Sequence, residues 1–123
     1  MPNIHVSVDG RIMTIVVEGI CSASDIVQSV NEYYPSSGGR SILWDLMRAD
    51  VISLTEEDFV RIASIVRKAL PPGESRKTAF AVTNRSSYLM MSKYLNEAVS
   101  ARVPVEYSVF TNVDAAKQWL EKR

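Results

Sequence analysis

The chain is 123 residues long, a length typical of one domain whose core needs no disulfide or metal. Its 14 basic and 14 acidic residues cancel, so no net field attracts nucleic acid or an anionic membrane surface. The single Cys21 excludes an internal disulfide, and no run approaches the roughly 20 apolar residues of a membrane span. With no signal-peptide pattern, we expect a soluble cytoplasmic domain over residues 1–123.

The N-terminal segment predicts two strands joined by a tight turn. From Asn3 to Val8 polar and apolar residues alternate, which is typical of a strand with one buried face and places His5 on the exposed face. Asp9-Gly10 marks a turn, and residues 12–18 are rich in β-branched side chains. We therefore expect an antiparallel hairpin.

A helix and a buried strand follow. Ser22 or Ser24 can cap the helix, whose apolar residues recur at helical spacing as far as Pro35. A loop-forming segment, residues 35–39, separates this helix from Ser41–Leu46, a short and mostly apolar run. Such a run is typical of a strand covered on both faces, so we place it in the middle of the sheet.

The second helix has the strongest pattern in the chain. Thr55 and Asp58 resemble a capping box at its start, and Pro71-Pro72-Gly73 is expected to end it. Its apolar stripe follows helical spacing and consists of Phe59, Ile62, Ala63, Val66 and Leu70.

Two further strand and helix pairs are predicted in the C-terminal half. Thr78–Val82 and Val105–Phe110 are the expected strands, Asn84 or Ser86 caps the helix between them, and Asn112 caps the last helix. The apolar faces of these helices comprise Tyr88, Met91, Tyr94, Leu95, Ala98 and Val99 in the first, and Val113, Ala116, Trp119 and Leu120 in the second.

The predicted order β-β-α-β-α-β-α-β-α indicates the α/β class. It describes one mixed sheet of about five strands with helices packed on it, and right-handed crossovers join the later strands.

The sequence around the central strand carries a family resemblance. Trp44-Asp45-Leu46-Met47-Arg48 precedes a helix start of Leu-Thr type, Leu54-Thr55-Glu56-Glu57-Asp58, and an aromatic and Met-rich helix follows at Tyr88–Tyr94. Together with the final strand and helix, from Val109-Phe110 to Trp119-Leu120, these segments resemble the STAS fold of bacterial anti-sigma-factor antagonists and their uncharacterised relatives. The resemblance covers nearly the whole chain and implies a non-enzymatic regulatory module with a protein partner.

The start of the second helix departs from that family. Antagonists carry Asp-Ser-Ser-Gly there, whereas a gap-free register from Asp45 places Ser53-Leu54-Thr55-Glu56 at the motif. Ser53 and Thr55 are therefore the hydroxyls available for a phosphorylation switch. We expect the loop from Met47 to Leu54 and the following helix start to face the partner.

Asp45 and Arg48 form the most informative polar pair. They follow the central strand at its carboxyl end, where open α/β sheets usually place ligands. The candidate partner or regulatory surface is therefore Asp45, Arg48, Ser53 and Thr55. The alternative is that Asp45 and Arg48 form a structural ion pair or loop hydrogen bonds.

Tyr88, Met91 and Tyr94 form a candidate apolar interface or ligand site. Met is adaptable and Tyr combines an apolar body with a polar tip, which suits a partner surface. The resemblance also extends in layout to the CRAL-TRIO lipid-transfer domains, so a small apolar ligand or lipid is the alternative function. Ordinary core packing would explain the same residues without either function.

No catalytic, metal or cofactor site is predicted. His5 is the only histidine, which leaves too few ligands for zinc, and Glu56, Glu57 and Asp58 are explained by the dipole of a helix start. The Gly-rich segment 36–40 leads into a strand and is interpreted as a connection rather than a phosphate loop.

Four basic residues are interpreted as a solvated helix end, with a small anion-binding patch as the alternative: Arg67, Lys68, Arg76 and Lys77. A homodimer is compatible with the neutral net charge.

Overall fold

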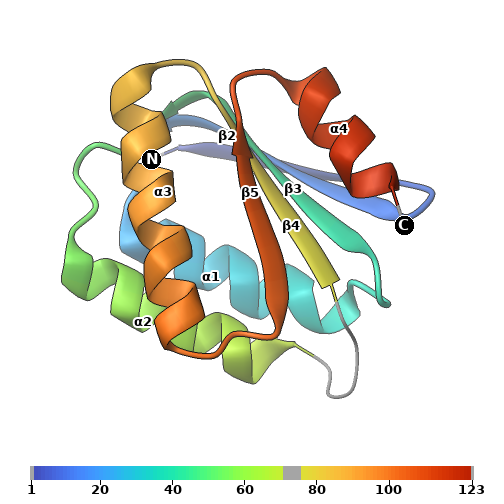
Figure 1. Cartoon of the computed structure of the whole chain (residues 1–123), viewed down its shortest axis with the longest axis horizontal. Coiled ribbons are helices and arrows are strands. Elements are labelled where there is room, and N and C mark those ends of the chain that lie inside the picture. Colours follow the sequence, from blue (N-terminus) through green and yellow to red (C-terminus); the bar gives the residue numbers. More distant parts are fainter. Residues whose placement is uncertain (1, 71–75, 123) are drawn as a thin grey trace.

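The computed structural model describes residues 2–70 and 76–122, which form one five-stranded sheet with four α-helices and a short 3₁₀ turn (Figure 1). In chain order the elements are β1 (Asn3–Asp9), β2 (Ile12–Ile20), α1 (Ala23–Tyr33), the 3₁₀ turn η1 (Tyr34–Ser36), β3 (Ser41–Asp50), α2 (Glu56–Ala69), β4 (Arg76–Val82), α3 (Arg85–Ser100), β5 (Val105–Phe110) and α4 (Val113–Glu121). The predicted element order and the α/β class are confirmed.

The strands lie in the sheet in the order in which they occur in the chain. β1 pairs with β2 in an antiparallel hairpin, and β2 to β5 are parallel, with β3 in the centre as predicted. Because each right-handed crossover moves one strand further in the same direction, α1, α2 and α3 all lie on one face of the sheet. α4 packs on the opposite face (Figure 1).

Each helix begins at a side chain that caps it. Ser22, Thr55, Asn84 and Asn112 each accept a hydrogen bond from the backbone N–H three residues later, so Ser22 and Asn84 are the caps rather than Ser24 and Ser86. α2 ends at Ala69 with Leu70 as its cap residue, and the expected stop signal at residues 71–73 lies outside the described residues.

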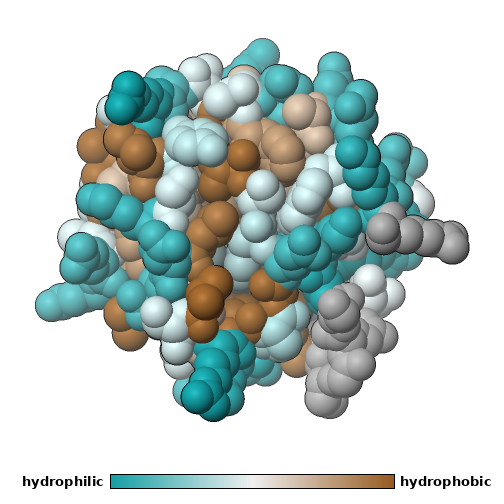
Figure 2. Space-filling model, viewed as in Figure 1, coloured by the Kyte–Doolittle hydropathy of each residue, from teal (hydrophilic) through white to brown (hydrophobic). Residues whose placement is uncertain are grey.

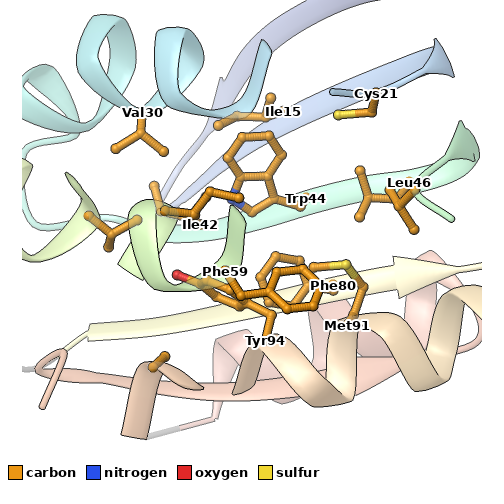
Figure 3. Packing of buried hydrophobic residues seen from close by; sticks show 14 of the residues in the cluster. Ile15, Cys21, Val30, Ile42, Trp44, Leu46, Phe59, Phe80, Met91 and Tyr94 are labelled. Atoms are coloured by element: carbon orange, nitrogen blue, oxygen red, sulfur yellow. The ribbon is translucent and has the colours of Figure 1, made fainter. Parts of the chain in front are cut away.

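The main core lies between the sheet and the three helices α1, α2 and α3. Figure 3 shows Phe80 of β4 beside Phe59 of α2 and Tyr94 of α3, whereas Trp44 of β3 lies toward Ile15 and Val30. The rings of Phe59 and Phe80 meet the Tyr94 ring edge to face, with centroids 5.9 and 5.8 Å away. The stripe predicted for α2 therefore reaches the core as expected.

A smaller core lies under α4. Ala116 and Leu120 of α4 pack on the strand residues Leu43, Ala79 and Ala81. The small side chains on β4 let the helix approach the sheet closely. β3 is thus buried on both faces, as its continuous apolar run predicts.

β3 is longer than its sequence predicts. The expectation of a strand that ends at Leu46 and a loop from Met47 is wrong, because β3 continues to Asp50. Val16 pairs with Asp45 but Glu18 pairs with Arg48, so two residues of β3, Leu46 and Met47, oppose the single Val17 of β2. The extra residue forms a β-bulge. Beyond it, β3 pairs with β2 again as far as Asp50.

Three apolar side chains lie further from the core than their patterns indicate. Val8 is 50% exposed at the end of the edge strand β1, and Val99 is 73% exposed near the end of α3. Tyr88 is 39% exposed. The apolar face of α3 is therefore narrower than predicted: Met91, Tyr94 and Ala98 are buried, and Leu95 is partly buried against the core.

Candidate functional site

Three helices begin at the same edge of the sheet, where the parallel strands end. We call this the carboxyl edge and define it as residues 19–22, 51–55 and 83–89, which contain the connections from β2, β3 and β4 to α1, α2 and α3 and the adjoining ends of β2 and α3. Ser53 and Thr55 belong to the middle segment. The structure therefore places both predicted hydroxyls at the edge where α/β proteins usually bind their ligands.

Two hydrogen bonds to Asp50 anchor the turn between β3 and α2. The backbone carbonyl of Asp50 accepts a hydrogen bond from the backbone N–H of Cys21 at 2.9 Å. The carboxylate of Asp50 accepts a second one from the backbone N–H of Ile52 at 3.0 Å. Val51 and Leu54 are buried, whereas Ile52 and Ser53 between them are exposed. The turn thus presents two side chains to solvent from an anchored backbone.

The Thr55 side chain caps the N-terminus of α2. Its hydroxyl accepts a hydrogen bond from the backbone N–H of Asp58 at 3.2 Å, and the Asp58 carboxylate accepts one from the Thr55 N–H at 2.9 Å. Glu56, Glu57 and Asp58 make the first turn of α2 acidic. A phosphate added at this position would break the cap and face three carboxylates.

Asp45 and Arg48 do not pair with each other. The Asp45 carboxylate accepts a hydrogen bond from the backbone N–H of Met47 at 3.1 Å, which supports the bulge. Arg48 instead donates to Glu18 of β2 at 3.3 Å, and Glu18 also lies 3.9 Å from the ring nitrogen of His5 on β1. Asp45 and Arg48 therefore have different partners. Asp45 makes a local structural hydrogen bond, which is the alternative that the sequence left open.

Arg48 lies on the sheet face that α4 covers only in part. Its side chain is 80% exposed, so its contact with Glu18 is a surface ion pair. Sequence reasoning missed Glu18, because the register between β2 and β3 brings these two residues together and no local motif encodes it.

The three residues predicted as an apolar site are divided between surface and core. Met91 and Tyr94 are buried among aromatic rings, and the cavity beside them measures only about 20 Å³, room for one water molecule. The filled core speaks against an apolar ligand between the sheet and α3, since such pockets measure several hundred Å³. Tyr88 alone reaches the surface, where it lines a shallow depression of about 480 Å³ with Thr83, Asn84, Arg85, Leu89 and Thr111.

Sequence reasoning missed two exposed aliphatic side chains at the carboxyl edge. Ile20 is 69% exposed and Ile52 is 57% exposed, and the segments that carry them are joined by the hydrogen bond from Cys21 to Asp50. On the face drawn in Figure 2, brown hydrophobic residues gather toward the left and centre. Both isoleucines lie at a strand end, because Ile20 is the last residue of β2 and Ile52 comes two residues after β3.

Burial strongly shifts the pKa values of four groups in the core. Burial raises the pKa of the Cys21 thiol to about 12, and it raises the pKa of the Tyr94 hydroxyl to about 12. Burial also raises the pKa values of Tyr34 and Tyr107 well above the usual range of tyrosine. These groups are neutral at physiological pH, so none of them is an activated nucleophile.

Within the described ranges, no three His, Cys, Asp or Glu side chains gather in the way that a metal ion requires. None of the helices in residues 2–70 and 76–122 is long and apolar enough to cross a membrane.

Two solved structures share this arrangement. An anti-sigma-factor antagonist from Mycobacterium paratuberculosis is 11% identical, with a TM-score of 0.66 over 99% of this chain and 96% of that chain. An uncharacterised protein of the DUF3478 family with a SpoIIAA-like fold, from Shewanella loihica PV-4, is 14% identical, with a TM-score of 0.58 over 97% of this chain and 93% of that chain. No family model and no curated protein matches the sequence. The chain therefore has the STAS-like fold that its sequence predicts.

Proposed function

We propose that this chain is a non-enzymatic regulatory module, a single cytoplasmic domain that binds a protein partner through the carboxyl edge. The observation that carries this proposal is the exposure of Ile20 and Ile52 on two connected segments beside the hydroxyl of Ser53. An apolar centre with a polar rim is the usual composition of a protein interface. The solved anti-sigma-factor antagonist supports the class of partner, because its name refers to a protein target.

The residues of the edge have different roles in this proposal. Ile20, Ile52 and Tyr88 supply apolar contact area, and the anchored turn at residues 51–55 costs little ordering on binding. Arg48 is an exposed charge on the neighbouring sheet face and contributes to the rate and specificity of association rather than to most of the affinity. Asp45 acts indirectly by supporting the bulge that places Arg48.

Ser53 is the residue at which this surface can be regulated. Its side chain is exposed, and a phosphate there would stand next to Glu56, Glu57 and Asp58. Like charges repel, so phosphorylation of Ser53 would disturb the start of α2 and weaken partner binding. Thr55 is less suited to modification because its hydroxyl already caps the helix.

The titratable groups support a non-enzymatic role. Catalytic acids, bases and nucleophiles usually have shifted pKa values in an accessible cleft. Here the shifted groups are Cys21 and three core tyrosines, and burial keeps them in their neutral forms.

A comparative pull-down tests the proposal. The tagged wild-type chain, an Ile52→Asp variant and an Ile20→Asp variant are each incubated with native cytosol. Val99→Asp is the matched control, because Val99 is 73% exposed at the other end of α3. A stoichiometric protein that the wild type and control retain and the edge variants lose supports the proposal. Equal retention by all four chains contradicts it.

A further inference from the structure

Cationic side chains from several separated segments meet at the opposite edge of the sheet, where the parallel strands begin. Arg11 lies in the β1–β2 turn, Arg40 precedes β3, Arg76 and Lys77 begin β4, and Lys122 follows α4. These residues line a cleft of about 550 Å³, which we call the amino-edge cleft. Figure 1 shows the β1–β2 turn and the end of α4 side by side at the end marked C.

Positive charge dominates this cleft. Its described lining includes the five cations and only two carboxylates, Glu106 and Glu121. In a chain whose net charge is zero, this local excess is a feature of the fold and not of the composition. A concave surface lined by one sign of charge concentrates ions of the opposite sign.

Two of the cations are held in place by neutral acceptors. Arg40 donates to the carbonyl oxygens of Gly10 at 3.1 Å and Ser37 at 3.2 Å. Lys77 donates to the Lys122 carbonyl at 2.7 Å, and its ammonium lies 5.0 Å from the centre of the Trp119 ring. Carbonyls and aromatic rings fix a cation without cancelling its charge.

Two other cations are left with open donors. The side chains of Arg11 and Lys122 are exposed and make no hydrogen bond or ion pair with any residue that the structure describes. Hydrogen bonds to backbone carbonyls at a turn and at helix ends explain the positions of Arg40 and Lys77, but they explain neither Arg11 nor Lys122.

Gly38 lines the cleft beside Arg40. Gly38 has φ +62°, and a Cβ atom there would lie 3.1 Å from a guanidinium nitrogen of Arg40. Any side chain at this position would press on Arg40 and adopt a strained backbone conformation. The segment interpreted from sequence as a connection thus also shapes the cleft.

We propose that the amino-edge cleft binds a phosphate group, carried by a small molecule or a lipid head group. Arg11 and Lys122 are the expected direct contacts, since guanidinium and ammonium groups donate strong hydrogen bonds to phosphate oxygens. The volume of the cleft falls within the range of small-molecule sites. This site lies at the opposite edge from the proposed partner surface, so either proposal can fail without the other.

Titration with inorganic pyrophosphate, followed by backbone amide chemical shifts in NMR, tests the site. We expect saturable shifts centred on the amides of Gly10, Gly38 and Gly39. In an Arg11→Ala/Lys122→Ala variant the affinity should fall roughly tenfold or more, since two charge-assisted contacts are lost. The control variant Arg61→Ala/Lys93→Ala removes the same charge from exposed helix positions and should bind as the wild type does.

Sedimentation with phosphatidylglycerol vesicles then identifies the source of the phosphate. Sedimentation that pyrophosphate reverses would assign the site to a lipid head group, and a chain that binds pyrophosphate but no vesicles would assign it to a soluble ligand. The proposal is overturned if the pyrophosphate shifts do not saturate, or if both double variants lose affinity equally.

Discussion

The indole N–H of Trp44 donates a hydrogen bond to the hydroxyl of Tyr34 at 2.9 Å, and both side chains are buried in the core. The indole can only donate, so Tyr34 is the group that makes a buried tryptophan acceptable on β3. The two rings lie 6.5 Å apart and tilted, which adds contact area to the hydrogen bond.

Tyr34→Phe should therefore destabilise the fold. The substitution leaves the Trp44 N–H buried without an acceptor, which costs about 1–3 kcal/mol of unfolding free energy. Urea denaturation measures the loss, and Tyr33→Phe is the control, because Tyr33 is only half-buried. Adding Trp44→Phe should cost less in the Tyr34→Phe background than in the wild type. Strict additivity would show that the hydrogen bond contributes nothing.

Thr55→Ala should weaken the start of α2. Loss of the reciprocal hydrogen bonds with Asp58 removes about 1 kcal/mol of stability. Thr55→Ser keeps a hydroxyl and should restore most of it. Ser53→Ala, two residues earlier and exposed, should change stability by less than about 0.5 kcal/mol. Thermal or chemical unfolding of the three variants separates capping from any role of these hydroxyls in partner binding.

Met91→Ala should cost more than Tyr88→Ala, although both residues lie on the same helix. Met91 is 4% exposed beside the small core cavity, and its truncation should cost about 2–5 kcal/mol. Tyr88 is 39% exposed, so its loss should cost well under half as much and affect partner retention instead. Similar losses of stability for the two variants would contradict the division of these residues between core and surface.

Stability should fall as the pH rises above about 10. Tyr34, Tyr94 and Tyr107 all have pKa values raised by burial, to about 12 for Tyr94. Between the ordinary tyrosine pKa near 10 and the raised values, the unfolded chain binds fewer protons than the folded chain, so deprotonation favours unfolding. The tyrosine contribution is fully present below pH 10 and is lost progressively above it, and the contribution of the buried Cys21 thiol, whose pKa rises from 9.0 to about 12, is lost over the range between those two values. Denaturation midpoints across this range, with absorbance of tyrosinate as the second signal, measure the effect.

The sequence was most informative where a structure is encoded locally. The caps Thr55 and Asn112, the turn at Asp9-Gly10 and the buried run in β3 all depend on neighbouring residues, and all were predicted. The same local evidence placed Ser53 and Thr55 at the helix start of the candidate site.

The remaining features depend on pairing between distant segments. The bulge opposite Val17 carried β3 past its predicted end, and the register of β2 gave Arg48 the partner Glu18 in place of Asp45. The amino-edge cleft likewise joins Arg11 to Lys122, which are more than a hundred residues apart in sequence. No periodicity or motif contains such information, because it arises only when the strands take their places in the sheet.

The strand order also bears on how the chain assembles during synthesis. From β2 to β5 each strand pairs with the strand that was made before it. A sheet of this kind can grow by one strand at a time as the chain leaves the ribosome, and no late strand has to enter between two that have already paired. The apolar side chains of Leu43, Ala79 and Ala81 stay exposed to solvent until α4 has been synthesised. Docking of α4 therefore completes the core on this face of the sheet.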